Sequence, residues 1–232
     1  MQKLLNPNRD YFTQADLDDS QCCGNSKILK HSFYERDTRI VAYELIGKFL
    51  VFQSENKILR GKIVETEAYR GSEDPASHAY RGVTPRTKVM FGEAGFSYVY
   101  FTYGFHYCFN VVTEKSGTAG AVLIRAVEPL SGIHLMKKRR GTEKPSELTN
   151  GPAKLTQAFG ITTKHSNLDL TVRDLHLEED FIAANTNGKI CEEHFINIGV
   201  STRIGIRDGR EFLYRFFLKD SPFVSCQKLK KK

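Results

Sequence analysis

Two glutamates on one expected strand are the strongest candidates for chemistry in this sequence. Glu65 and Glu67 lie in the segment IVETEAY, and because successive side chains of a strand point to opposite faces, they would share a face with Tyr69. A carboxylate held at the mouth of an apolar, aromatic pocket can act as a general base. The alternative is an ion pair at a sheet edge, with Lys62 or Arg70 as the partner. Spacing alone leaves both interpretations open.

The polar segment RGSEDPASHAY follows this strand and is expected to form a loop that contains His78. Glu73 and Asp74 precede Pro75, and we expect both to be solvated charges of a turn. For Glu65 we expect a structural role at most.

An aromatic segment, residues 95–114, predicts two strands that meet in a tight turn around FTYGF. Aromatic side chains in a basic protein are suited to base stacking. The alternative is a hydrophobic core that uses them as bulk, and for Phe101 and Phe109 we prefer it. The candidates for stacking are Tyr98, Tyr100, Tyr103, Phe105 and Tyr107.

Two residues of this segment are expected to do more than pack. Tyr103 lies beside Gly104 at the expected hairpin tip, where it is poorly placed to reach the core and could wedge into a base stack. Asn110 lies at the start of an apolar strand, so its buried amide needs partners or a ligand. An amide both donates and accepts, which suits discrimination between base edges.

The net charge of +7 over 232 residues favours an anionic partner such as nucleic acid or a membrane surface, although a protein can also be basic without such a partner. No run of about 18 apolar residues predicts a membrane span, and the first residues do not resemble a signal peptide. Five cysteines, without a CxxC pair, predict reduced thiols in a reducing compartment.

Metal and cofactor motifs are missing from the sequence. The histidines are scattered without HExxH, and no Cys/His spacing indicates zinc. Neither GxxxxGK[ST], GxGxxG nor GxSxG occurs. We therefore expect no metal and no cofactor.

The elements that must position these residues predict an α+β fold. A helix is expected from a capping box of Ser32 and Glu35 as far as Gly47. A hairpin turning at SENK follows, then the aromatic hairpin, a strand over 119–130, a short helix at GIHLMKKRR and a second helix at GPAKLTQAFG. Further short strands are expected at LDLTV, FINIGVSTRIGI, FLYRFFL and PFVS.

The sum is a single mixed domain with a curved, mostly antiparallel sheet, several helices and a protruding β-hairpin. We expect residues 1–30 to be a flexible N-terminal arm, residues 31–227 to be the catalytic domain, and residues 228–232 to be a basic tail.

Several blocks in one order resemble the alkyladenine (3-methyladenine) DNA glycosylase family. They are IVETEAY, EDPASH, TPR, MF, YVYFTYGFHYCFNV, LIRAVEP, GPAKLTQAF, RIGI and SPFVS. The resemblance covers residues 33–226, and such a series is far more specific than any single motif.

The resemblance implies a role for each matching position. Glu67 would be the catalytic glutamate, and Arg125 would lie near the nucleophilic water and a backbone phosphate. A backbone carbonyl bound to that water would belong to Ile204. Tyr103 would intercalate into DNA. The base-binding residues would be Tyr69, His78, Tyr100 and, for discrimination between bases, Asn110.

The implied activity is monofunctional removal of alkylated or deaminated purines from double-stranded DNA, which leaves an abasic site without a lysine Schiff base. The enzyme would be a monomer, in the cytoplasm or nucleoid of a bacterium or the nucleus of a eukaryote, and not secreted. One departure is His106, where the family often has an aromatic residue. The alternative function is a non-catalytic nucleic-acid-binding module, but such a module gains nothing from Glu67, which repels phosphate.

Overall fold

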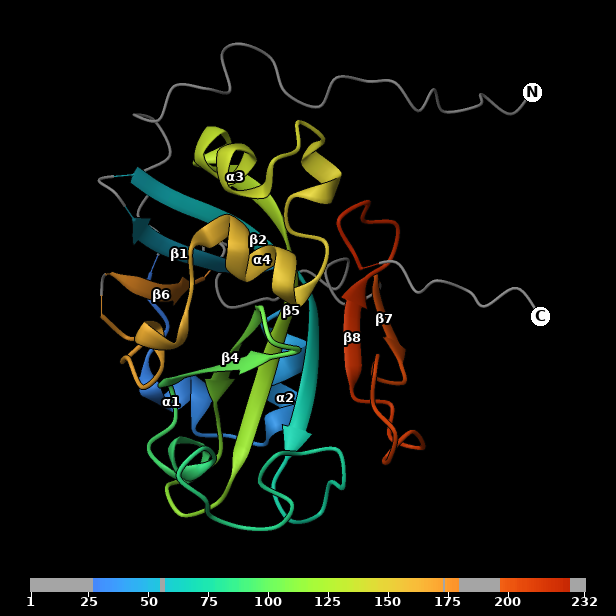
Figure 1. The fold of residues 1–232 in the computed structure, drawn as a ribbon. Helices are drawn as coiled ribbons and strands as arrows, with labels where there is room; N and C mark the ends of the chain where they lie inside the picture. Colours follow the sequence, from blue (N-terminus) through green and yellow to red (C-terminus); the bar gives the residue numbers. More distant parts are fainter. Residues whose placement is uncertain (1–26, 55–56, 173, 180–196, 226–232) are drawn as a thin grey trace, which may run out of the picture.

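A long strand, β2 (Lys57–Arg70), organises the sheet because its two halves have different neighbours along one edge (Figure 1). Its first half pairs with β1 (Phe49–Ser54), and residues 65–67 pair with β8 (Arg215–Leu218). Its other edge pairs along most of its length with β5 (Gly120–Ser131). The computed structural model describes residues 27–54, 57–172, 174–179 and 197–225.

The remaining strands extend this sheet on both sides. Its order is β3-β4-β5-β2-β1-β6, and β8 links β2 to β7; every pair is antiparallel. The bounds are β3 (Ser97–Thr102), β4 (His106–Val112), β6 (Leu175–Glu178) and β7 (Ile198–Ser201). The α+β class with a curved antiparallel sheet is thus confirmed.

Helices cover one face of the sheet and enclose the main hydrophobic core. They are α1 (His31–Tyr34), α2 (Thr38–Glu44), α3 (Ile133–Arg140) and α4 (Pro152–Phe159), with short 3-10 turns at Lys88–Phe91, Pro145–Glu147 and Thr163–His165. Leu45 beside α2 and Phe159 in α4 belong to one buried cluster with Ile124 of β5. Because strand side chains alternate, Leu123 and Arg125 point to the other face, where a site can form.

The single helix expected from Ser32 to Gly47 is wrong. The chain breaks between α1 and α2, and Ser32 lies inside α1, whose N-cap Lys30 makes no side-chain cap bond. Asp37 begins α2 instead, since its Oδ1 accepts a hydrogen bond from the Arg39 amide at 2.8 Å. An aspartate at this position offers the backbone a partner outside the helix and so restarts it.

Two expected strands, LDLTV and PFVS, are also wrong. In the first, the Asp169 carboxylate accepts from the amide and the hydroxyl of Thr171, which bends the chain locally. In the second, the amide of Ser225 donates to Glu65 instead of to a neighbouring strand. Conversely, β6 was not predicted from the sequence.

The expected N-terminal arm and basic tail lie almost wholly outside the described residues. Just before α1, Ile28 forms a β-bridge with Glu178, and the Leu29 amide donates to the Leu177 carbonyl.

The β3–β4 hairpin protrudes from the sheet, and its tip is aromatic. Tyr103 is 80 % exposed and Phe105 is 71 % exposed. Tyr103 has φ 52° and Gly104 has φ 77°, so a tyrosine occupies the left-handed region that costs a non-glycine residue about 1 kcal/mol. Phe109 is buried as expected, but Phe101 is half exposed, so the expectation of a core position for Phe101 is wrong.

Candidate active site

One rung of the sheet brings together side chains from five strands. Across β3, β4, β5, β2 and β8 the aligned residues are Tyr98, Asn110, Leu123, Glu67 and Arg215. Neighbours on a rung point to the same face, so this alignment carries Asn110 and Glu67 to one side of the sheet although 43 positions separate them in the chain.

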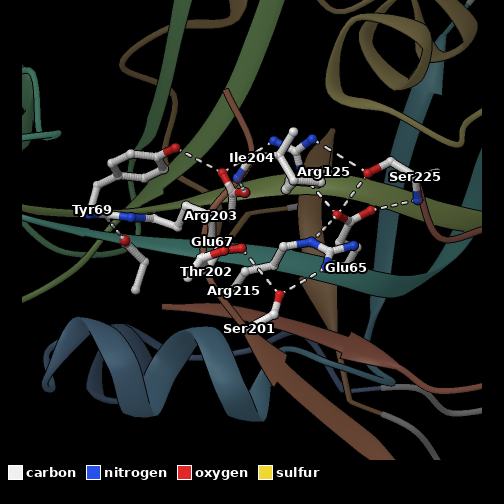
Figure 2. Close-up of polar contacts among 11 residues, drawn as sticks. Glu65, Glu67, Tyr69, Arg125, Ser201, Thr202, Arg203, Ile204, Arg215 and Ser225 are labelled. Atoms are coloured by element: carbon white, nitrogen blue, oxygen red, sulfur yellow. Dashed lines mark hydrogen bonds and ion pairs between the residues drawn. The ribbon is translucent and has the colours of Figure 1, made fainter. Parts of the chain in front are cut away.

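Two bulges beside Glu65 bring Arg125 into line with the glutamates. The pairing of β2 with β5 shifts between Ile63 and Glu65 and again between Glu65 and Thr66. Val64 and Arg125 are therefore left without a register partner. Bulges of this kind re-aim side chains near functional sites, and here the Arg125 guanidinium reaches both carboxylates. Its Nε lies 2.9 Å from Glu65 Oε1, and its Nη1 lies 3.2 Å from Glu67 Oε2 (Figure 2).

Glu67 is fully buried, and both of its oxygens are held. Oε1 accepts a hydrogen bond from the Ile204 amide at 2.7 Å, and Oε2 accepts one from the Tyr69 hydroxyl at 2.8 Å as well as the contact from Arg125 (Figure 2). Burial raises the pKa of Glu67, and this effect exceeds the opposing effects of Arg125 and the two hydrogen bonds. A buried carboxylate with a raised pKa is a stronger base than a solvated one.

Glu65 is equally buried but is bound more tightly by cations. Its Oε1 accepts from Arg125 and, at 2.7 Å, from Arg215, while Ser225 donates through its amide and its hydroxyl. Burial alone would raise the pKa of Glu65, but the charges of both arginines and the Ser225 bonds lower it. Glu65 therefore joins β2, β5, β8 and the C-terminal segment. Its partners are these two arginines rather than Lys62 or Arg70.

A cavity of about 310 Å³ opens in front of Glu67. Seven of the eight residues to which the family resemblance assigns a role line it, namely Tyr69, His78, Tyr100, Tyr103, Asn110, Arg125 and Ile204. The eighth, Glu67, lies directly behind the wall, since its hydrogen-bond partners Tyr69, Arg125 and Ile204 are lining residues.

One wall of the cavity consists of aromatic side chains from the loop and β3 that pack edge to face. The rings of His78 and Tyr100 lie 4.6 Å apart, and His78 Nδ1 is 2.9 Å from the hydroxyl of Tyr98. Arg86 lies over the Tyr100 ring, 4.9 Å from its centroid. Desolvation of the His78 ring, together with the charge of Arg86, lowers the pKa of His78 to about 4, so the imidazole is neutral at pH 7. The sequence named Tyr98 as a candidate for stacking but did not indicate its contact with His78, and it indicated no role for Arg86.

Asn110 is fixed by its own hairpin. Its Nδ2 donates to the carbonyl of Tyr98 at 3.0 Å and to that of Cys108 at 3.4 Å. Both bonds use the amide nitrogen, which orients the side chain and leaves its oxygen as the group that can meet a ligand in the cavity.

Asp74 is not the solvated charge expected from the sequence. It is 1 % exposed and forms an ion pair with Arg203, itself 4 % exposed. Glu73, by contrast, is exposed and pairs with Arg70 at 2.6 Å. The sequence could not indicate the burial of Asp74, because its partner lies 129 positions away.

No group of three or more His, Cys, Asp or Glu side chains suited to a metal ion occurs among the described residues. In the same part of the chain, no helix is long and apolar enough to cross a membrane.

A buried glutamate lies behind an aromatic cavity, beside an exposed aromatic hairpin on a basic protein. Such an arrangement is typical of an enzyme that acts on nucleic acid. The sequence profile of the methylpurine-DNA glycosylase family matches residues 32–222, and the chain belongs to that family. It is therefore a DNA glycosylase of alkylated bases, a hydrolase of DNA repair.

Three bacterial relatives carry the name "Putative 3-methyladenine DNA glycosylase". The protein of Carboxydothermus hydrogenoformans is 50% identical over 199 residues, 85% of this chain and 98% of its own length. That of Prosthecochloris aestuarii is 46% identical over 194 residues, 83% of this chain and 88% of its own length. That of Francisella tularensis subsp. tularensis is 48% identical over 184 residues, 79% of this chain and 91% of its own length.

Proposed function

We propose that the protein flips an alkylated or deaminated purine out of double-stranded DNA and hydrolyses its N-glycosidic bond with a water that Glu67 activates. The water oxygen bonds to C1′ of the sugar, and the electron pair of the C1′–N bond leaves with the base. Glu67 takes a proton from the water. The products are the free purine and an abasic site.

The observation that carries this proposal is the setting of Glu67. A carboxylate has about four lone-pair positions, and three donors occupy three of them here, which leaves one for a water. The raised pKa makes Glu67 a suitable base, while its negative charge stabilises the oxocarbenium character that develops on the sugar. Arg125 has two roles in this reaction: it donates to Glu67, and it attracts the phosphate of the flipped nucleotide. The Ile204 carbonyl is the second group that holds the water.

The walls of the cavity suit a purine in a sandwich. Tyr69 provides one face, and His78 with Tyr100 provides the other. An electron-poor alkylated purine stacks well on electron-rich rings. Neutral His78 adds no positive charge to repel a cationic base. For uncharged lesions, a hydrogen bond from the His78 region and protonation of the departing base contribute more to catalysis than stacking of a positive charge does.

Two further positions complete the recognition of damage. Tyr103, exposed at the hairpin tip, fills the stack that the flipped base vacates. His106 packs against Phe105, with ring centroids 4.0 Å apart, and so supports the tip. Asn110, held by two carbonyls, obstructs the exocyclic amino group of normal guanine.

The partner is double-stranded DNA that contains damaged purines. The protein binds it as a monomer, in the cytoplasm or nucleoid. Lys and Arg side chains hold the DNA phosphates without reading the base sequence. No cofactor and no lysine Schiff base take part.

An excision assay over a panel of duplexes tests this function. Each duplex carries one 3-methyladenine, 7-methylguanine, hypoxanthine or 1,N6-ethenoadenine, or no lesion, and the assay contains a chelator in place of metal. We expect release of a damaged purine, an alkali-labile abasic site, and no enzyme–DNA adduct after borohydride. Tight lesion binding without any release would instead support the non-catalytic module.

A further inference from the structure

Asp74 and Arg203 form a buried ion pair beside the cavity, and neither residue has a role in the proposed reaction. Arg203 Nη2 lies 2.7 Å from Asp74 Oδ1, and its Nη1 contacts the other carboxylate oxygen. Arg203 Nη2 also donates a longer hydrogen bond, of 3.4 Å, to the Gly209 carbonyl. A two-pronged contact between a planar guanidinium and a carboxylate fixes both groups in orientation.

The carboxylate end of the pair holds the loop that leads to His78. Asp74 accepts hydrogen bonds from the amides of Arg70 and Ala76, both at 3.1 Å. Arg203 meanwhile donates to the carbonyl of Ala68 at 2.9 Å. The pair therefore ties the start of this loop to the end of β2.

The guanidinium end of the pair lies next to Tyr69 and Ile204, the two uncharged groups that donate hydrogen bonds to Glu67. Its carbon lies 4.6 Å from the centroid of the Tyr69 ring, whose hydroxyl donates to Glu67 Oε2. The residue after Arg203 is Ile204, whose amide donates to Glu67 Oε1 (Figure 2). Arg203 therefore contacts the ring of one of these donors and precedes the other in the chain.

We propose that Asp74 and Arg203 are positioning residues that hold the Tyr69 hydroxyl and the Ile204 amide against Glu67, and so set the geometry of the general base. The catalytic part of this inference rests on the proposed function, whereas the placement of Glu67 does not. A merely structural pair would stabilise the loop without altering the environment of Glu67.

The pKa of Glu67 separates these two roles. The hydrogen bonds from Ile204 and Tyr69 both lower it against the larger effect of burial, so loosening them raises it. Besides Tyr69 and Arg203, the charged or titratable groups that face Glu67 are Glu65, Arg125, Cys108 and Arg215, and neither substitution in the test replaces one of these four.

The test uses the full chain with two substitutions and one control. Arg203→Lys keeps the charge but loses the planar fork. Asp74→Asn keeps the volume and removes the charge that fixes Arg203. Glu73→Gln is the control, because it removes the same charge from the neighbouring position, where the side chain is exposed and pairs with Arg70.

Two measurements are made on each variant that unfolds cooperatively. The pKa of Glu67 is followed by carboxyl ¹³C NMR, with the signal assigned by its loss in Glu67→Gln. Single-turnover excision is compared with the Kd for lesion DNA. We expect Arg203→Lys and Asp74→Asn to raise the pKa of Glu67 and to slow excision by about 100-fold, while the Kd changes less than about threefold. Glu73→Gln should match the wild type in both.

An unchanged pKa of Glu67 in a folded Arg203→Lys or Asp74→Asn protein overturns the inference. So does a loss of excision that follows only a loss of lesion binding. If the pKa moves as expected but the wild type releases no damaged purine, the proposed function fails and the positioning of Glu67 by this pair stands.

Discussion

Glu65 and Glu67 share the guanidinium of Arg125, yet their pKa values are shifted in opposite directions. Both side chains are fully buried, so desolvation acts on each. The difference lies in the other partners, since Glu65 has a second arginine, Arg215, while Glu67 has only uncharged donors besides Arg125. The same strand thus carries one carboxylate stabilised as an anion and one poised to accept a proton.

Glu65→Gln is expected to destabilise the protein by about 3 kcal/mol at pH 7, because it breaks a buried ion pair and leaves Arg125 and Arg215 less compensated. The folded pKa of Glu65 lies below its usual 4.5, so its contribution is fully present above pH 4.5 and is lost only as the pH falls through the folded value. Urea unfolding should therefore give the same difference from the wild type at pH 7 and pH 5. A difference that shrinks over this interval would contradict the assignment.

Glu67→Gln is expected to have the opposite effect on stability while it abolishes the reaction. The folded pKa of Glu67 lies above 4.5, so the ionised carboxylate destabilises the folded protein at pH 7. Replacing it with the uncharged amide should raise the free energy of unfolding by about 1 kcal/mol. This gain should narrow as the pH falls from 7 toward 4.5, because the wild-type carboxyl becomes protonated in the folded state. Excision should fall by orders of magnitude, because the amide cannot take the proton, whereas lesion binding persists. Unchanged single-turnover excision would remove Glu67 from the role of base.

Part of this site is predictable from local sequence. The alternation of β2 places Glu65, Glu67 and Tyr69 on one face, and the turn chemistry around Gly104 places Tyr103 at an exposed tip. Both inferences need only neighbouring residues, which is why they agree with the structure.

The charge network is not predictable in this way. Arg125 reaches the glutamates through two bulges in the β2–β5 pairing, and no local pattern specifies a bulge here. Likewise, local sequence indicates that Asp74 is an exposed turn residue, whereas in the folded protein it is buried in an ion pair with Arg203. The register of distant strands and the burial of a charge by a distant partner depend on the whole fold.

His78 is expected to contribute no titration to excision between pH 5 and pH 8, because its pKa of about 4 keeps it neutral throughout that range. The acidic limb of the pH–rate profile for excision should report the titration of Glu67. The rate should fall as the pH falls through a pKa above 4.5. Single-turnover rates on a hypoxanthine duplex measure this. His78→Asn should lower the rate without moving the limb. Loss of an inflection near pH 6.5 in that variant would instead assign the inflection to His78.

Tyr103→Ser is expected to weaken capture of the flipped base more than it alters bond cleavage. The side chain is 80 % exposed and makes little contribution to the core, so the fold should be unaffected. Removing an aromatic stacking partner costs about 1–3 kcal/mol, or roughly 5-fold to 150-fold in the flipping equilibrium. Stopped-flow fluorescence of 1,N6-ethenoadenine in a duplex reports flipping directly. Undiminished flipping would show that Tyr103 is no wedge.

Asn110→Ser is expected to relax discrimination against normal guanine. The Asn110 amide is anchored to the carbonyls of Tyr98 and Cys108, so its position at the cavity does not adapt to the base that enters. A rigid group that meets the exocyclic amino group of guanine rejects it sterically and by an unpaired polar contact, an effect of about 1–3 kcal/mol. The shorter serine removes that obstacle, so release of guanine should rise relative to release of hypoxanthine by about 5-fold to 150-fold. Competition between the two duplexes in one reaction measures this ratio directly and cancels differences in active enzyme concentration. An unchanged ratio would mean that shape elsewhere in the cavity, at Tyr69 or Tyr100, excludes guanine.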